Sequence, residues 1–508
     1  MIQFVKKNLL LLTPEMTSII MKKVARGEKM SAKKILLINP NQLKPVVCPI
    51  ALDYLTFSLK EKGYAVDVLD LAFSSNLKTS VDDYFEKKSC QAIGVTIRNV
   101  DDSFWISQDF FLPRIKEIID YIKSRTDAPI ILGGSGFSVM PERILKFFEL
   151  DLGIYGEGED SFPSFLEVIR DERRYSSIPG LVYKTQGGFR INPTKNVDLS
   201  RTLRLTRDAI DNERYFQEGG MGAIETKRGC SKTCIYCLDP LCKGREVRLR
   251  QPQNVVDEIE IMFGKGINYF HFCDSEFNLP YHHAKAICEE IIKRGLAGRI
   301  FWYTYASPTP FTHELASLMK ISGCEGIDFG VDSGSDEMLK RLGRDFASHD
   351  LVRTAKICQQ HDITFMYDLL LGGPGETNHT LKETVDLMKK IKPSRVGVAI
   401  GIRIYPGTRL SEMVLSEGSL ENNKNLYGRI KGNEDFFEPI FYVSSLVGEK
   451  ILPFVATLVG EDERFFLPTT QEVDDNYNYN DNSILADAIK KGYRGAFWDI
   501  LRRVHENK

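Results

Sequence analysis

Residues 228–237 read Arg228-Gly229-Cys230-Ser231-Lys232-Thr233-Cys234-Ile235-Tyr236-Cys237, and this stretch decides how the rest of the chain is interpreted. Three thiolates in one tight loop can hold three irons of a cubane cluster and leave the fourth iron without a protein ligand. That iron can then bind a substrate or a cofactor. A structural zinc site would need a fourth ligand, which Cys242 could supply. We favour the cluster over zinc or unliganded thiols because triplets this close seldom arise by chance.

Length and composition limit the classes of protein to which the chain can belong. A chain of 508 residues is too long for one core, so we expect two or three domains. The 67 basic and 69 acidic residues give a formal net charge of −2, which argues against a nucleic-acid partner. Ten cysteines without a secretory leader favour a reducing compartment, and we expect the protein to be cytoplasmic.

The N-terminal extension, residues 1–32, contains two apolar runs. Pro14, Glu15 and several lysines interrupt them well short of the ~20 apolar residues that a membrane span requires. We expect a helix, either an amphipathic helix that docks on the protein or an anchor on a membrane surface.

The first domain is expected over residues 33–166 and is of the α/β class. Helical patterns separate apolar runs in this segment, which predicts βαβ units and a parallel sheet. Ligands of such sheets bind beyond the carboxyl ends of the strands. The predicted strands are 35–38, 66–69, 92–96 and 130–134, and the contact loops are 39–49, 96–103, 133–137 and 156–159.

A linker over 167–220 separates this domain from the next. Pro179-Gly180 and Gly187-Gly188 frame a predicted hairpin with strands at 181–183 and 189–191.

The second domain is expected over residues 221–415. Its strand-like segments alternate with helical ones, which predicts six β/α units, and barrels of this kind carry their active sites at the carboxyl ends of the strands. The predicted strands are 222–226, 269–272, 301–305, 326–331, 366–371 and 396–404. The remaining residues, 416–508, predict short helices with aromatic clusters, a mostly helical module that could cap the barrel.

The cysteine triplet with Tyr236 resembles the signature of the radical S-adenosylmethionine (SAM) superfamily. The run Gly372-Gly373-Pro374-Gly375-Glu376-Thr377 and the run Tyr405-Pro406-Gly407-Thr408 resemble the family's fifth and sixth strand endings. The resemblance implies a partial (β/α)6 barrel, a [4Fe-4S] cluster on Cys230, Cys234 and Cys237, and bound SAM. It also implies an electron donor such as flavodoxin or ferredoxin.

The family resemblance extends to residues that would bind SAM. Arg341 and Arg344 are candidates for pairing a carboxylate, because a guanidinium can bind one in a bidentate manner. Asp332 stands where the family usually has a glutamate. The residues assigned to SAM by resemblance are Glu276, Asn278, Asp332, Ser333, Gly372, Gly373, Pro374 and Glu376.

The first domain resembles the Rossmann-like (flavodoxin-like) cobalamin-binding domain that precedes the radical SAM core in one subfamily. The matching pieces are Asn39-Pro40, Gly133-Gly134 with Pro141-Glu142, and 156–159. The first histidine is His271, so the domain offers no imidazole to cobalt, and a vestigial domain without corrin is the alternative. The residues assigned to cobalamin by resemblance are Asn39, Thr96, Gly133, Gly134, Gly156 and Glu157.

The function implied by the resemblance is methyl transfer from SAM by way of cobalamin to an unactivated carbon of a small molecule. A rearrangement, cyclisation or carbon–carbon coupling with the same cofactors is the alternative. A non-enzymatic carrier of cluster or corrinoid is a third, but it would need no SAM pocket, and the Gly372–Thr377 run argues against it. No catalytic side chain is identified from the sequence.

Overall fold

The computed structural model describes residues 34–200, 205–468 and 480–506. The predicted N-terminal helix falls outside these ranges. None of the helices in the described part of the chain has the length and apolar character needed to span a bilayer.

The first sheet has the strand order β2-β1-β3-β4-β5-β6-β7, and its first five strands are parallel. This is the flavodoxin-like order 2-1-3-4-5, extended by a hairpin. The strands are β1 Lys34–Asn39, β2 Ala65–Asp70, β3 Ala92–Thr96, β4 Ile130–Gly133, β5 Leu152–Ile154, β6 Leu181–Thr185 and β7 Gly188–Ile191. The hairpin predicted in the linker is therefore present as β6 and β7, and it pairs antiparallel with β5.

Helices cover both faces of this sheet, since its central strands are apolar on both sides. β1 alternates Leu36 and Ile38 into one core with Ile35 and Leu37 in the other. The covering helices are α3 Ile50–Glu61, α4 Leu77–Lys87, α5 Leu112–Lys123, α6 Ser135–Val139, α7 Pro141–Phe148 and α8 Ser161–Val168.

The second sheet has the order β19-β15-β14-β13-β12-β11-β8 and is parallel throughout. Its strands are β8 Gly222–Ile224, β11 Tyr269–Phe272, β12 Phe301–Ala306, β13 Cys324–Asp332, β14 Thr364–Leu371, β15 Arg395–Ile400 and β19 Phe465–Phe466. The main helices between them are α11 Pro252–Gly264, α12 Tyr281–Lys293, α13 His313–Ile321, α14 Asp336–Arg341, α15 Ser348–Gln360 and α16 Asn378–Ile391. The predicted partial (β/α)6 barrel is confirmed, with β19 as an additional edge strand.

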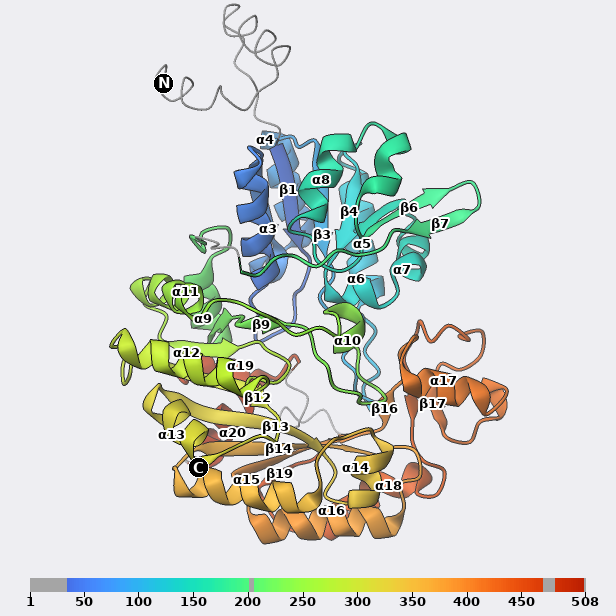
Figure 1. The fold of residues 1–508 in the computed structure, drawn as a ribbon. Helices are drawn as coiled ribbons and strands as arrows, with labels where there is room; N and C mark the ends of the chain where they lie inside the picture. Colours follow the sequence, from blue (N-terminus) through green and yellow to red (C-terminus); the bar gives the residue numbers. More distant parts are fainter. Residues whose placement is uncertain (1–33, 201–204, 469–479, 507–508) are drawn as a thin grey trace, which may run out of the picture.

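The C-terminal region packs on the barrel in two places. One place is a small sheet with the strand order β16 Ile402–Arg403, β18 Ile440–Tyr442 and β17 Leu426–Gly428. In the chain, α17 Arg409–Ser416 lies between β16 and β17, and α18 Ile451–Val459 follows β18. The last helices, α19 Ser483–Lys490 and α20 Phe497–Glu506, bury Trp498 and Leu501 in a core shared with Tyr303 and Met366. In Figure 1 the first domain lies above the barrel, and the segment around α10 Asp239–Cys242 runs between them.

Candidate functional site

The cysteine loop follows β8 and the two-residue strand β9, Lys227–Arg228, at the carboxyl end of the barrel. Gly229 has φ 94°, and a side chain there would place Cβ 2.0 Å from the carbonyl oxygen of Glu246. The thiols of Cys230, Cys234 and Cys237 lie close enough to act on one another electrostatically. Burial raises the pKa of the Cys234 thiol to about 11. Three thiols in one loop, one buried and two partly exposed, fit the donor set of an iron–sulfur cluster, which binds them as thiolates.

Cys242 lies apart from this triplet in α10. Its sulfur is 3.8 Å from the carbonyl oxygen of Ser135 in the first domain. Among the described residues, no three His, Cys, Asp or Glu side chains are arranged to hold a single metal ion. A cubane differs from a single ion because each thiolate binds a different iron. That Cys242 is not a ligand remains a prediction, and the direction of its sulfur supports it.

Charged side chains from the barrel surround the cysteine loop. Arg344 donates from Nη1 to Cys234 Sγ at 2.9 Å and lies 3.5 Å from Asp332, which accepts a hydrogen bond from the Tyr236 hydroxyl at 2.7 Å. Glu276 Oε1 is 3.9 Å from Arg344, and Glu276 Oε2 is buried with no hydrogen-bond partner among the described residues. Burial raises the pKa of Glu276 to about 7. A carboxylate here could bind a cation, either the ammonium of SAM or an iron.

Two residues assigned to SAM by resemblance, Asn278 and Ser333, have their polar atoms in protein contacts. The Asn278 amide donates to the carbonyls of Ser307 and Pro310 and accepts from the Ser307 N–H. Its two donors are therefore used within the protein. The Ser333 hydroxyl pairs with Thr384 at 2.9 Å and accepts from the Ser335 N–H. These contacts hold the ends of β11 and β13 and leave no amide donor of Asn278 for a ligand.

Glu376 is also buried rather than placed at a helix start. It accepts from the Thr380 hydroxyl and the Gly372 N–H, and the N-cap of α16 is Thr377. Burial raises the pKa of Glu376 to about 7. Thr377 therefore caps α16, and the Glu376 carboxyl group is hydrogen-bonded within the protein.

Apolar side chains of the protein pack against the loop after β14. A Cβ on Gly373 would lie 2.9 Å from Leu342 Cδ2 and 3.2 Å from Ile402 Cδ1, and Pro374 is buried beside it. The Ser444 N–H donates to the Gly372 carbonyl at 2.8 Å and so joins this loop to the chain that follows β18. At Gly373 the small residue is thus required by the packing of apolar side chains.

Of the two arginine candidates, Arg344 lies at the loop of cysteines, whereas Arg341 pairs with Glu337 on an exposed helix face.

A narrow slot of about 210 Å³ opens at the carboxyl ends of the strands of the first domain. It reaches inward to Leu37, Gly94 and Phe162 and is bounded by Gly133, Gly134 and Gly156. A Cβ on Gly133 would meet nothing closer than 3.9 Å, so this glycine borders open space. A largely apolar slot bordered by glycine backbone at the strand ends fits a part of cobalamin, whose cobalt would accept and donate a methyl group when bound.

Asn39 and Glu157, two residues assigned to cobalamin by resemblance, have side chains that bond to other residues of the protein. Asn39 donates to Asp70 at 2.9 Å and to Tyr215 at 3.0 Å, and it accepts from the Asn41 N–H. Glu157 is bound in a bidentate manner by Arg248, at 2.7 and 2.9 Å. Glu157 lines the slot and Asn39 lines a second cavity described below, but both side chains are hydrogen-bonded to other segments of the protein. Thr96, Gly133, Gly134 and Gly156 remain the predicted contacts.

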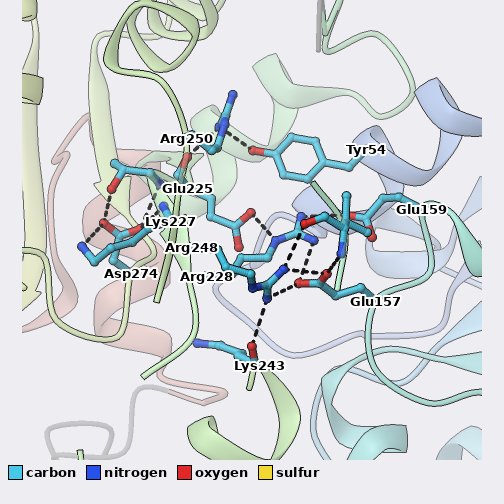
Figure 2. A network of polar contacts seen from close by, with 12 residues as sticks. Tyr54, Glu157, Glu159, Glu225, Lys227, Arg228, Lys243, Arg248, Arg250 and Asp274 are labelled. Atoms are coloured by element: carbon cyan, nitrogen blue, oxygen red, sulfur yellow. Dashed lines mark hydrogen bonds and ion pairs between the residues drawn. The ribbon is translucent and has the colours of Figure 1, made fainter. Parts of the chain in front are cut away.

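An ion network joins the two domains beside the slot (Figure 2). Arg228, only 11% exposed, pairs with Glu159 at 2.6 Å, Glu225 at 2.8 Å and Glu157 at 3.3 Å. The network also contains Arg248, Arg250, Tyr54, Lys243, Lys227 and Asp274. Since Glu157 and Glu159 belong to the first domain and the arginines to the barrel, the network fixes how the two face each other.

A larger interdomain cavity of about 430 Å³ adjoins the slot. The two share Thr96, Gly134 and Ser135. From the barrel side the cavity is lined by residues that the sequence analysis did not assign, and these include His271, Tyr303, Tyr305, Asp328 and Trp498. A sequence signal was present, since Asp328 is an acid between the apolar residues Ile327 and Phe329 of a buried strand.

Comparisons with known proteins agree with this arrangement. The family model of the B12 binding domain matches residues 41–166, and that of the radical SAM superfamily matches 224–388. Tryptophan 2-C-methyltransferase of Streptomyces laurentii is 29% identical over 569 aligned positions, covering 91% of this chain and 95% of that protein.

Two solved structures of the radical SAM methyltransferase TsrM from Kitasatospora setae are also similar. One, with tryptophan substrate and a SAM analogue bound, has a TM-score of 0.87 at 30% identity and covers 94% of this chain and 98% of that chain. The other, with cobalamin and a [4Fe-4S] cluster bound, has a TM-score of 0.85 at 29% identity, with the same coverage of both chains. The chain therefore belongs to the cobalamin-dependent radical SAM methyltransferases.

Proposed function

We propose that this protein transfers a methyl group from SAM, by way of bound cobalamin, to a carbon atom of an aromatic amino compound about the size of tryptophan. The observation that carries the proposal is the junction of the two cavities. The narrow slot ends where the interdomain cavity of about 430 Å³ begins. A molecule in that cavity would lie between the cobalamin site and the barrel, and the volume is within the range of small-molecule sites.

The lining of the cavity supports an aromatic substrate. Tyr305 is 40% exposed although it lies on a central barrel strand, and its ring is 5.2 Å from that of His271 in an edge-to-face arrangement. Trp498 of α20 closes the same cavity. Aromatic rings bind other rings in offset or edge-to-face contacts. The similar protein of Streptomyces laurentii, named for methylation of tryptophan, supports the same substrate class.

The experiment is an anaerobic incubation of the reconstituted protein with methyl-labelled SAM, reductant, cobalamin and L-tryptophan. A labelled methyl group on the acceptor together with S-adenosylhomocysteine is expected. Mass spectrometry of the products also detects 5′-deoxyadenosine. Formation of 5′-deoxyadenosine without any methylated product would instead indicate the rearrangement or coupling chemistry.

The roles of the site residues are part of the proposal. We propose that Cys230, Cys234 and Cys237 hold a [4Fe-4S] cluster, with Asp332, Glu276 and the Gly372–Glu376 loop beside the SAM site. Thr96, Gly133, Gly134 and Gly156 line the cobalamin site. We propose domain boundaries at 33–166, 167–220, 221–415 and 416–508.

Cluster ligation is tested by replacing single cysteines. Ala at any of the three positions should remove the iron–sulfur absorption at ~400 nm, whereas Cys242→Ala should retain it. Iron content of the anaerobically purified variants is the measurement. Equal loss of iron in Cys242→Ala would show that the cluster has four cysteine ligands.

Two further proposals concern the setting of the protein. A donor such as flavodoxin or ferredoxin would reduce the cluster. A cytoplasmic location is supported by ten cysteines, none of which forms a disulfide.

A further inference from the structure

Asp328 lies on the cavity face of the central barrel strand β13. Its register partners are Tyr305 on β12 and Met366 on β14. Its sequence neighbours Ile327 and Phe329 belong to the main apolar core on the opposite face. Because side chains alternate along a strand, Asp328 is directed away from that core and into the interdomain cavity, which it lines.

One carboxylate oxygen of Asp328 is buried without a hydrogen-bond partner among the described residues. The residue is 5% exposed, and its Oδ1 has no hydrogen bond to any of the residues that the structure describes. A buried carboxylate is normally paired or hydrogen-bonded, since its desolvation otherwise costs free energy. This oxygen could therefore accept a hydrogen bond from a donor on a molecule bound in the cavity.

The nearby ionisable groups of the barrel do not compensate this charge. Asp368 on β14 and Glu276 after β11 act on Asp328, and both are acids. Burial lowers the pKa of His271 to about 4, so this ring of the cavity is neutral at physiological pH. Burial, reinforced by the two acids, raises the pKa of Asp328 well above its ordinary value. This part of the cavity is suited to a cation.

We propose that Asp328 binds the protonated amine of the methyl acceptor and thereby selects acceptors that carry a primary amine in addition to an aromatic ring. The inference rests on the proposed function and adds the group by which the acceptor is recognised. Tyr305, which pairs in register with Asp328, would contact the ring of the same molecule. Arg98 of the first domain and Lys243, which follows α10, also line the cavity. The carboxylate at the other end of an amino acid would therefore meet positive charge.

SAM also carries an ammonium group, so the experiment must separate the two sources of the amine. Holoenzyme reconstituted with cluster and cobalamin is tested by equilibrium dialysis against matched pairs that differ by the amine alone. The pairs are L-tryptophan with indole-3-propionate and L-phenylalanine with 3-phenylpropionate, and SAM is measured separately. The proteins are the wild type, Asp328→Asn and Glu325→Gln, a control that removes a carboxyl from the same strand outside the cavity lining.

The wild type should bind the better amine of the panel about 10- to 100-fold more tightly than its deaminated partner, the effect typical of a hydrogen bond to a charged group. Asp328→Asn should lose this preference, and Glu325→Gln should keep it. The affinity for SAM should stay the same in all three proteins. Loss of SAM affinity in Asp328→Asn with an unchanged amine preference would assign Asp328 to SAM and overturn the proposal.

The remaining outcomes separate this inference from the proposed function. If tryptophan is methylated but Asp328→Asn weakens both members of a pair equally, the amine contact is wrong and the function stands. If tryptophan is not methylated but phenylalanine binds in an Asp328-dependent manner, the proposed substrate is wrong and the amine contact stands. A wild type that binds both members of every pair equally, or binds no amine, overturns the inference without any need for a folded variant.

Discussion

The ion network at the domain boundary and the wall of the interdomain cavity both contain buried carboxyl groups, but their surroundings are opposite. In the network, Asp274 accepts from the Thr226 N–H at 2.9 Å and from Lys227 Nζ at 3.0 Å. In the cavity, Asp328 Oδ1 has no hydrogen bond to the described residues. Both side chains belong to the same barrel and both are nearly inaccessible.

The pKa values differ in the corresponding directions. Burial alone would raise the pKa of Asp274, yet Lys227 and the Thr226 hydrogen bonds hold it below its ordinary value. Burial and two neighbouring acids raise the pKa of Asp328. The comparison shows that Lys227 supplies the cation beside Asp274, whereas the charged neighbours of Asp328 among the described residues are acids, a setting that favours a cationic ligand.

The largest effect is expected when the network loses its central cation. Arg228→Met removes the guanidinium that contacts Glu157, Glu159 and Glu225, and breaking a buried ion pair typically costs about 3–5 kcal/mol. We expect a loss of this size in the free energy of unfolding, measured by urea denaturation of the apoprotein. Arg173→Met is the matched control, since its pair with Asp171 is on the surface and Arg173 is 91% exposed. Equal losses in the two variants would contradict the comparison.

Most of the fold could be predicted because its signals are local. The apolar run 35–38 is a strand in the structure, and the hairpin strands were placed by the glycines between them. The predicted strand 396–404 is divided into β15 in the barrel sheet and β16 in the small sheet. β19 was not predicted, because two residues, Phe465–Phe466, carry no periodicity and become a strand only by pairing with β15. Long-range pairing of this kind is not visible in a short window of sequence.

The site was predictable only where its residues are neighbours in the chain. The cysteine triplet lies within one loop, so its spacing was enough to propose a cluster. For Asn278 and Glu376 the sequence located the residue near the strand ends but could not show that Ser307 and Thr380 satisfy their polar atoms. Asp328 was not assigned because its significance depends on contacts with β12, β14 and the first domain.

An intermediate loss of stability is expected for a substitution in the loop after β14. Like the ion network, this loop makes its contacts with other residues of the protein. Gly373→Val would force apolar volume against Leu342 and Ile402, and overpacking typically costs about 1–3 kcal/mol. We expect the melting temperature to fall and SAM affinity to fall with it, because α14 and the cysteine loop adjoin this core. Differential scanning calorimetry and equilibrium dialysis measure the two. Weakened SAM binding with unchanged stability would show that the glycine faces the ligand instead.

The smallest effect on stability is expected at the unpaired acid of the cavity, and its sign is the sharpest test of the comparison. Asp328→Asn replaces a carboxyl whose ionisation is unfavourable in the fold, so at neutral pH the ligand-free variant should be as stable as the wild type or up to about 1 kcal/mol more stable. The charged groups that act on Asp328 are Asp368 and Glu276, which repel it; Arg98 and Lys243 also line the cavity, and His271 is neutral above about pH 4.

The pH dependence follows from the raised pKa of Asp328. A carboxyl whose pKa is higher in the folded than in the unfolded state contributes stability that is fully present below the unfolded pKa and is lost as the pH rises through the folded pKa. The stability of the wild type relative to Asp328→Asn should therefore decrease as the pH rises from about 4. Urea denaturation of both proteins between pH 4 and 8 measures this difference, and groups common to both cancel. A wild type that instead gains stability over the variant with rising pH would show that Asp328 has a cationic partner within the protein, as Asp274 does.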